Sequence, residues 1–330
     1  MGGNKYDRVD ALIDGRVSIE GADVTFEVSK IGDLNTHVFS GPQTLDVTEI
    51  GLHPFMLAYA NEGFRHYTLI PVFPLRFFRH RSVFIRTDRG IEEPEDLRGR
   101  VVAGPLYSSS SLTWIRGFLQ HDYGVKPEHL EWVIPSTVSD TLSGNSSKQE
   151  SMVPEGISVR QAPAGVDESE LLVSGEVDAV IHAVVPKAFA EGNPVVGRLF
   201  PDFRDTERAY FAKTGIFPIM HAVAVRRDLI EEHPWLPEAV FRAYSRAKLL
   251  AYEYLRNEAF IKDSLPWLEQ ELAETIELMG DNYWSYGIEG NQKSLEALFQ
   301  YSHEQGLASS QLTIEELFHP STLELTEDES

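Results

Sequence analysis

Arginine, phenylalanine and histidine stand side by side in the segment RFFRH, which ends at His80. In an extended strand alternate side chains point to opposite faces, so Phe77 and Arg79 would share one face and Arg76 and His80 the other. A guanidinium binds a carboxylate through two parallel hydrogen bonds, and a neighbouring phenyl ring can stack on an aromatic ligand. Arg76, Arg79 and Phe77 are therefore candidates for a site that binds a carboxylate. Alternatively, Arg79 pairs with an acid such as Glu49 and stabilises the fold.

Positive charge is concentrated around this segment, although the whole chain of 330 residues has a net charge of −22. Residues 76–89 contain one acid, Asp88, and the arginines Arg76, Arg79, Arg81, Arg86 and Arg89. The overall acidity argues against a nucleic-acid partner, because binding phosphates requires a basic face. A small anionic molecule fits the local excess of charge; an ordinary solvated strand edge is the alternative.

Four consecutive serines at 108–111 precede an expected helix. Hydroxyls and free backbone N–H groups at a helix start bind anions. One serine serves as the N-cap, and we expect Ser109 or Ser110 to contact a ligand. Trp114 and Arg116, one turn further on, either line the ligand cleft or pack inside the fold.

Histidine titrates near neutral pH, which makes it a candidate for acid–base chemistry. The candidates are His53, His80, His182 and His221. His182 lies in the apolar run AVIHAVV, so a satisfied core residue is the alternative there. His221 follows the segment FPIM and should face a cleft. No two histidines have HxH or HxxxH spacing, so the pattern predicts no metal site, although a divalent metal stays open.

Other protein classes are disfavoured by what the sequence lacks. Without cysteine there is no disulfide, thiolate metal site or cysteine nucleophile. A P-loop, a GxGxxG fingerprint and a Ser-His-Asp grouping are missing as well, and no cofactor is expected. The longest apolar runs, such as 179–185, are strand-sized and predict no membrane span. The N-terminal MGGNKYDRVD shows no secretory signal, so we expect a cytoplasmic location.

Strands and helices alternate along the chain, which predicts an α/β fold. Strands are expected at 67–73, 82–86, 100–103, 179–183 and 222–225, and helices at 54–61, 112–123, 237–260 and 292–303. The strand at 82–86 leads into a compact α/β stretch and the strand at 222–225 leads out, as for a second lobe inserted into a first across two hinge strands. We predict a discontinuous first lobe, 1–90 and 218–330, an inserted second lobe, 91–217, and a ligand cleft between them.

Motifs spread over nearly the whole chain point to one family. They are YDRVDALIDGRV at 6–17, PVFPLRFFRH at 71–80, EDLRGRVVAGP at 95–105, TWIRGFL at 113–119, GEVDAVI at 175–181, TGIFPIMHAVAVR at 214–226 and HEQGL at 303–307. The chain resembles the 4,5-dihydroxyphthalate decarboxylases, whose fold is the periplasmic-binding-protein-like type II arrangement. It departs from them at the start, because the family usually has a strand before YDR and the sequence predicts that this strand is short or missing here. It also departs at 51–54, where GLHP replaces small hydroxyl residues.

The resemblance implies decarboxylation of a dihydroxylated aromatic dicarboxylate, 4,5-dihydroxyphthalate to protocatechuate, in aromatic catabolism. We expect His80 and His221 to divide the acid and base roles, with His182 as a third candidate. The expected substrate-binding set is Arg8, His53, Arg76, Phe77, Arg79, Ser109, Ser110, Trp114 and Arg116. A solute-binding protein for an aromatic carboxylate would use the same arginines without the acid–base pair, and a related lyase on another aromatic acid is a further alternative. A homodimer is compatible with the chain's size.

Overall fold

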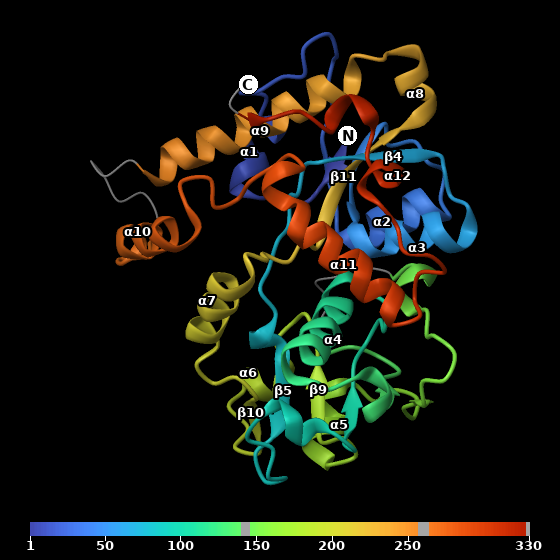
Figure 1. Cartoon of the computed structure of the whole chain (residues 1–330), viewed down its shortest axis with the longest axis vertical. Coiled ribbons are helices and arrows are strands. Elements are labelled where there is room, and N and C mark those ends of the chain that lie inside the picture. The colour runs from blue at the N-terminus through green and yellow to red at the C-terminus, as the bar shows by residue number, and fades with distance from the viewer. Residues whose placement is uncertain (140–145, 257–263, 328–330) are drawn as a thin grey trace.

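A computed structural model describes residues 1–139, 146–256 and 264–327. In these ranges the strands form two sheets, which lie in separate parts of the molecule (Figure 1). The first sheet has the order β2-β1-β3-β11-β4, with β1 (Gly2–Gly3), β2 (Glu27–Val28), β3 (Val47–Gly51), β4 (Tyr67–Ile70) and β11 (His221–Arg226). The second has the order β10-β5-β9-β6-β7-β8, with β5 (Val83–Arg86), β6 (Val101–Ala103), β7 (Glu131–Ile134), β8 (Val159–Gln161), β9 (Ala179–Ile181) and β10 (Val196–Arg198).

Helices flank both sheets. Those before β5 are α1 (Asp7–Ile13), α2 (Ile31–Phe39) and α3 (Leu52–Glu62). Those between β5 and β11 are α4 (Ser110–Tyr123), α5 (Glu168–Ser174), α6 (Lys187–Ala190) and α7 (Phe203–Thr214). Those after β11 are α8 (Arg227–Glu232), α9 (Leu236–Leu255), α10 (Leu268–Met279), α11 (Gln292–Glu304) and α12 (Ile314–Leu317).

The second sheet is inserted between two strands of the first. The chain leaves β4 for β5 and returns from α7 to β11, and the two crossing segments run antiparallel to each other. Arg76 and Ile219 form an isolated bridge between them, and the Met220 amide donates to the Leu75 carbonyl at 2.9 Å. Strand β5 pairs with β9 and β10 in the second sheet, whereas the sequence-based boundary at residue 90 placed it with the first.

Each sheet contributes to its own apolar core. The central strands β3 and β11 are buried along nearly their whole length, as expected for short apolar runs between helices. The long helix α9 buries one face, which includes Val240, Tyr244 and Ala247, and packs against α1. A separate cluster of buried side chains, which includes Trp132 and Phe118, forms a core beside the second sheet. We refer to the two parts as the first and second lobes.

Helix α4 of the second lobe packs closely against α11, which runs from the first lobe toward it (Figure 1). Gly117 permits this approach, because a Cβ there would lie 2.0 Å from the Tyr301 ring. The Trp114 Nε1–H also donates to the Ile219 carbonyl in the returning crossing segment, at 2.9 Å. The start of α4 is therefore held at the junction of the lobes.

Several elements differ from the sequence-based expectation. The segment that ends at His80 is not a regular strand; it carries the isolated bridge at Arg76 and then a 3-10 turn at His80–Ser82. Helix α9 ends at Leu255, and the end of the predicted helix, from residue 257, lies outside the described residues. The first strand, which was expected to be short or missing, is present as the two-residue β1. None of the helices in the described ranges combines the length and apolar character needed to cross a bilayer.

Candidate active site

A cavity of about 260 Å³ lies where the two lobes meet. Its walls come from the first lobe, the second lobe and both crossing segments. The polar lining residues include Asn4, Tyr6, Asn35, Arg79, Ser109, Ser110, Ser111, Glu150, His182 and His221. Apolar side chains such as Leu75, Leu106 and Met220 complete the walls. The volume lies below the range of roughly 300–1,000 Å³ that is usual for drug-sized ligands, which favours a single-ring molecule.

A carboxylate and an imidazole form a buried pair at the first-lobe wall. His221 Nδ1 lies 2.5 Å from Glu49 Oε1. Burial alone raises the pKa of Glu49, but the hydrogen bond and charge of His221, with hydrogen bonds from Asn4 and Tyr6, outweigh it, so the pKa of Glu49 lies below its ordinary value. The ionised carboxylate only accepts hydrogen bonds, so Nδ1 is the protonated nitrogen. Nε2 is then the ring nitrogen left to a bound molecule.

Strand register explains how this pair forms. Strands β3 and β11 are antiparallel, with Val223 opposite Glu49 and His221 opposite Gly51. Glu49 and His221 are therefore diagonal neighbours on one face, within reach of long side chains. The Tyr6 hydroxyl donates to Glu49 Oε1 at 2.8 Å, and the Asn4 amide donates to Oε2 at 2.7 Å. Both carboxylate oxygens are thus held in place.

A second carboxylate–imidazole pair belongs to the second lobe. His182 follows β9, and its Nδ1 lies 3.4 Å from Oε1 of the buried Glu168 in the first turn of α5. Burial raises the pKa of Glu168, but its interaction with His182 and the hydrogen bonds from Ser139 outweigh this effect and leave the pKa below its ordinary value. His182 lines the cavity. Two imidazoles from different lobes therefore line the same cavity.

Arg79 supplies the positive charge of the cavity lining. Its side chain is buried, and Nη1 donates to the Ala183 carbonyl at 3.2 Å. The Nε–H has no hydrogen-bond partner among the described residues. Burial lowers the pKa of Arg79 to about 9, so the group stays cationic at neutral pH. Glu49 pairs with His221, so the alternative of an Arg79–Glu49 pair is not realised.

The start of α4 faces the cavity with three serines. Ser109 is the N-cap, and its hydroxyl accepts from the Leu112 amide. The Ser110 hydroxyl donates to the Met220 carbonyl at 2.9 Å, and Ser111 Oγ lies 3.2 Å from Ser109 Oγ. All three line the cavity, and the expectation that Ser109 or Ser110 contacts a ligand stays a prediction. First-turn amides of a helix lack intrahelical acceptors and can bind an anion; that of Leu112 already donates to Ser109.

The structure corrects the expectation that His80 faces His221 in the cleft. His80 does not line this cavity; it stacks on Phe118 with ring centroids 4.2 Å apart and also contacts Phe200 and Tyr210. Burial lowers the pKa of His80 to about 4, so the ring is neutral. Chain reversal at the 3-10 turn directs this side chain into the second-lobe core, and the second imidazole of the cavity is that of His182.

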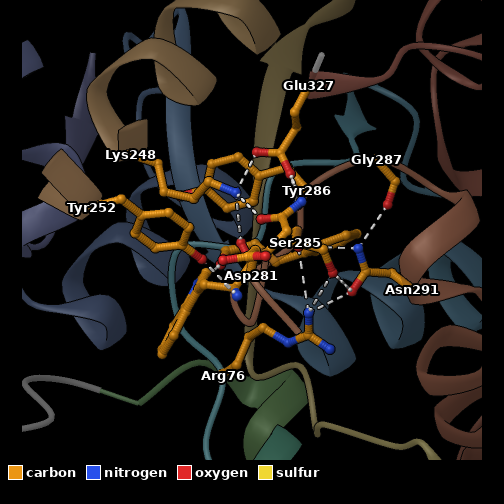
Figure 2. A network of polar contacts seen from close by, with 12 residues as sticks. Arg76, Lys248, Tyr252, Asp281, Ser285, Tyr286, Gly287, Asn291 and Glu327 are labelled. Carbon is orange, nitrogen blue, oxygen red and sulfur yellow. Dashed lines mark hydrogen bonds and ion pairs between the residues drawn. The ribbon is translucent and has the colours of Figure 1, made fainter. Parts of the chain in front are cut away.

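Arg76 is also corrected, because it points away from the cavity toward the C-terminal part of the first lobe. Figure 2 shows its guanidinium directed at Ser285 and Asn291. Nη1 lies 2.5 Å from Asn291 Oδ1 and Nη2 donates to the Phe217 carbonyl at 2.7 Å. The same network continues to the buried Lys248–Glu327 ion pair. Arg76 therefore anchors the crossing segments.

Trp114 and Arg116 pack inside the protein instead of lining the cavity. Trp114 is fully buried against Tyr301. The Arg116 guanidinium lies 3.9 Å from the centre of the Tyr107 ring and donates to Gln305 Oε1 at 2.9 Å. Trp114 belongs to the core of the first lobe, whereas Arg116 lies against the Tyr107 and Trp132 rings of the second lobe.

The other three side chains that were expected to bind substrate lie outside the cavity. His53 is fully buried, with Nδ1 2.6 Å from the Ser108 carbonyl oxygen and Nε2 2.8 Å from Ser302 Oγ. Arg8 donates to the Pro74 carbonyl at 2.7 Å and stacks on the rings of Tyr6 and Trp284. The Arg79 guanidinium lies over the Phe77 ring, with its carbon 4.7 Å from the ring centre. None of His53, Arg8 and Phe77 lines the described cavity.

Sequence reasoning missed the residues that orient the two imidazoles. Glu49 was considered only as a partner of Arg79, and Glu168, Asn4 and Asn35 were not considered. Tyr6 was noticed only as part of the YDR motif. The spacing of residues along the chain does not predict which carboxylate will pair with which histidine. Among the described residues, no group of three or more His, Cys, Asp or Glu side chains is placed to hold a metal ion.

Solved structures identify the class to which this two-lobed arrangement belongs. A periplasmic sulfonate-binding protein from Methylobacillus flagellatus matches with a TM-score of 0.55 and 15% sequence identity, over 96% of this chain and 86% of that one. The periplasmic aliphatic sulphonate-binding protein of Escherichia coli matches with a TM-score of 0.51 and 14% identity, over 96% and 90%. These likenesses show the fold alone: a periplasmic-binding-protein-like type II fold, as the sequence predicted.

Sequence comparison then identifies the family. No protein-family model matches the chain. The chain is 37% identical over 319 residues to the 4,5-dihydroxyphthalate decarboxylase of Comamonas testosteroni, covering 97% of this chain and 95% of that protein. It is 35% identical over 197 residues to the enzyme of the same name from Pseudomonas putida, covering 60% and 74%. The chain belongs to the 4,5-dihydroxyphthalate decarboxylase family, and the predicted resemblance is confirmed.

Proposed function

We propose that this protein decarboxylates 4,5-dihydroxyphthalate to 3,4-dihydroxybenzoate (protocatechuate) in phthalate degradation. The observation that supports this best is a single cavity lined by two carboxylate-held imidazoles, His221 and His182, together with the buried cation of Arg79. Full-length similarity to a curated decarboxylase supports the reaction type.

The reaction needs a base and an acid at different positions of one ring. Direct loss of carbon dioxide would leave an unstabilised aryl anion. A base instead removes the proton from the hydroxyl para to the departing carboxylate, and electron density moves through the ring to the carbon that bears this carboxylate. That carbon takes a proton from an acid. The carbon–carboxylate bond then breaks, its electron pair restores the aromatic ring, and the phenolate regains a proton.

Two imidazoles on opposite lobes suit this division of labour. One accepts the phenolic proton and the other delivers a proton to the ring carbon, each typically contributing roughly 10²–10⁴-fold. Glu49 and Glu168 stay ionised and would stabilise the imidazolium when each ring is protonated. A cavity between the lobes brings both imidazoles to one ring, because His221 lies in the first lobe and His182 in the second.

Arg79 and the start of α4 are the groups suited to the carboxylates. Arg79 has an unused buried Nε–H, and the serines add hydroxyls and first-turn amides. Apolar residues such as Leu106, Leu112 and Met220 make up the rest of the wall. An apolar surface disfavours the charged carboxylate relative to neutral carbon dioxide, which assists departure of the leaving group.

Incubation of the purified protein with 4,5-dihydroxyphthalate tests the proposal. Carbon dioxide and 3,4-dihydroxybenzoate should appear in equal amounts, and phthalate, which lacks the hydroxyls, should not react. Parallel reactions with a chelator determine whether a divalent metal takes part. Tight binding of 4,5-dihydroxyphthalate without carbon dioxide release would contradict an enzyme and favour a solute carrier.

A further inference from the structure

Asn35 places a buried hydrogen-bond donor at the cavity that the protein itself does not use. The side chain of Asn35, on α2, is fully buried and lines the cavity. Its Nδ2 has no hydrogen-bond partner within the described residues. An unsatisfied buried donor is costly, and native proteins rarely keep one without a reason. A ligand oxygen would satisfy it.

The orientation of the Asn35 amide is set by the backbone. Oδ1 accepts from the Gly51 amide at 2.9 Å. A backbone N–H can only donate, so this atom must be the oxygen and the other must be the donor nitrogen. Nδ2 is therefore the group that remains for a ligand.

The same contact places Nδ2 near Gly51, on the face of the sheet from which the His221 side chain projects. Gly51 is the direct cross-strand partner of His221, so a side chain at position 51 would point to the same face as the imidazole. A Cβ on Gly51 would lie 3.1 Å from Asn35 Nδ2. The absence of a side chain at Gly51 thus leaves room for the amide next to the Glu49–His221 pair.

We propose that Asn35 determines specificity by binding a ring hydroxyl next to the one that His221 deprotonates; this rests on the proposed decarboxylase function. A catechol presents two adjacent oxygens. Nε2 of His221 accepts the proton of one, and Asn35 Nδ2 donates to the other. The hydroxylated edge of the ring then faces the first lobe, His221 is the base, and His182 is the acid at the ring carbon.

Discrimination follows from the cost of leaving Asn35 unpaired. A substrate with one hydroxyl can still donate electron density to the ring carbon that bears the departing carboxylate. It lacks, however, the oxygen that Nδ2 would contact. Sites built to hydrogen-bond a substrate hydroxyl reject the analogue that lacks it more strongly than apolar pockets reject an extra group. The expected loss is roughly ten- to a hundredfold in kcat/KM.

The test compares 4,5-dihydroxyphthalate with 4-hydroxyphthalate. The wild-type protein should prefer the first, and Asn35→Ala should lower its kcat/KM by roughly ten- to a hundredfold while changing that of 4-hydroxyphthalate only a few-fold. Asn35→Leu keeps a similar side-chain volume but has no polar atom for the second hydroxyl, so it should also abolish the preference. The ratio of the two kcat/KM values is independent of the fraction of folded protein.

A matched control and a binding measurement separate the possible outcomes. Asn291→Ala removes a buried asparagine that contacts Arg76 outside the cavity, and it should leave the substrate ratio unchanged. An equal loss on both substrates in Asn35→Ala overturns the role of Asn35. Affinities for 3,4-dihydroxybenzoate and 4-hydroxybenzoate provide the same ratio without turnover. Binding without decarboxylation would therefore refute the proposed function while the Kd ratio still decides the role of Asn35.

Discussion

The Glu49 carboxylate and the His221 imidazole are 2.5 Å apart although 172 positions separate them in the chain. The antiparallel register of β3 and β11 brings them together. The carboxylate fixes which nitrogen of the imidazole bears the proton, so the other nitrogen meets the cavity. In the proposed mechanism, Glu49 would in this way orient His221 for proton transfer.

Removal of this pair should slow turnover more than binding. We expect His221→Asn to lower kcat by roughly 10²–10⁴-fold, with the Kd of 3,4-dihydroxybenzoate changed only modestly. Glu49→Gln should lower kcat by roughly 10–100-fold, as for other residues that orient a functional histidine. Tyr6→Phe removes one hydrogen bond to Glu49 and serves as a milder comparison. Stopped assays of product formation measure these rates, and an unchanged kcat in His221→Asn would remove His221 from the mechanism.

Arg79 and Arg76 offer a matched pair of buried arginines, one at the cavity and one behind it. Arg79→Met should raise KM roughly ten- to a hundredfold, because a charge-assisted hydrogen bond to a carboxylate contributes about 1.5–3 kcal/mol. Arg76→Met should lower the thermal midpoint, since Asn291 and the Phe217 carbonyl lose their donor, but KM should change little in the protein that stays folded. Equal effects of both substitutions on KM would show that Arg79 has no special role in binding.

His80 should be dispensable for chemistry. Its ring lies among Phe118, Phe200 and Tyr210, and its Nδ1 is buried without a partner in the part of the chain that the structure describes. We expect His80→Phe to keep kcat within a few-fold and to leave stability equal or slightly higher, since an unsatisfied polar atom is removed. A loss of kcat beyond tenfold, in a variant with a normal melting curve, would contradict the position assigned to His80.

His53 should make the protein sensitive to acid. Burial, with a smaller effect of the Arg116 charge, lowers the pKa of His53 to about 3, against 6.5 for the unperturbed group. Between these values the unfolded chain binds the extra proton, so the stability from neutral His53 is complete above about pH 6.5 and declines as the pH falls toward 3. His53→Gln lacks this titration. Urea unfolding at pH 7.5 and pH 5 should show a smaller gap between variant and wild type at pH 5; an equal gap at both would be inconsistent with a buried neutral His53.

Local patterns in the sequence determined the elements that have local causes. The helix after the serine run is α4, with Ser109 as its cap, and the apolar runs became β9 and β11. Neighbouring residues decide such features through capping, periodicity and burial. The order of strands and helices also predicted an inserted second lobe. Motifs along the chain, read as a resemblance, predicted the family.

Tertiary structure alone decided which side chains meet in the cavity. Arg76, Arg79 and His80 are close in sequence, yet they point to the C-terminal network, the cavity and the second-lobe core, because the crossing segment bends where a regular strand was expected. Glu49, Asn35 and His221 come from distant segments that β3 and its cross-strand pairing with β11 bring together. Contacts between side chains from distant segments depend on strand register and on how the two lobes pack. The spacing of residues along the chain determines neither.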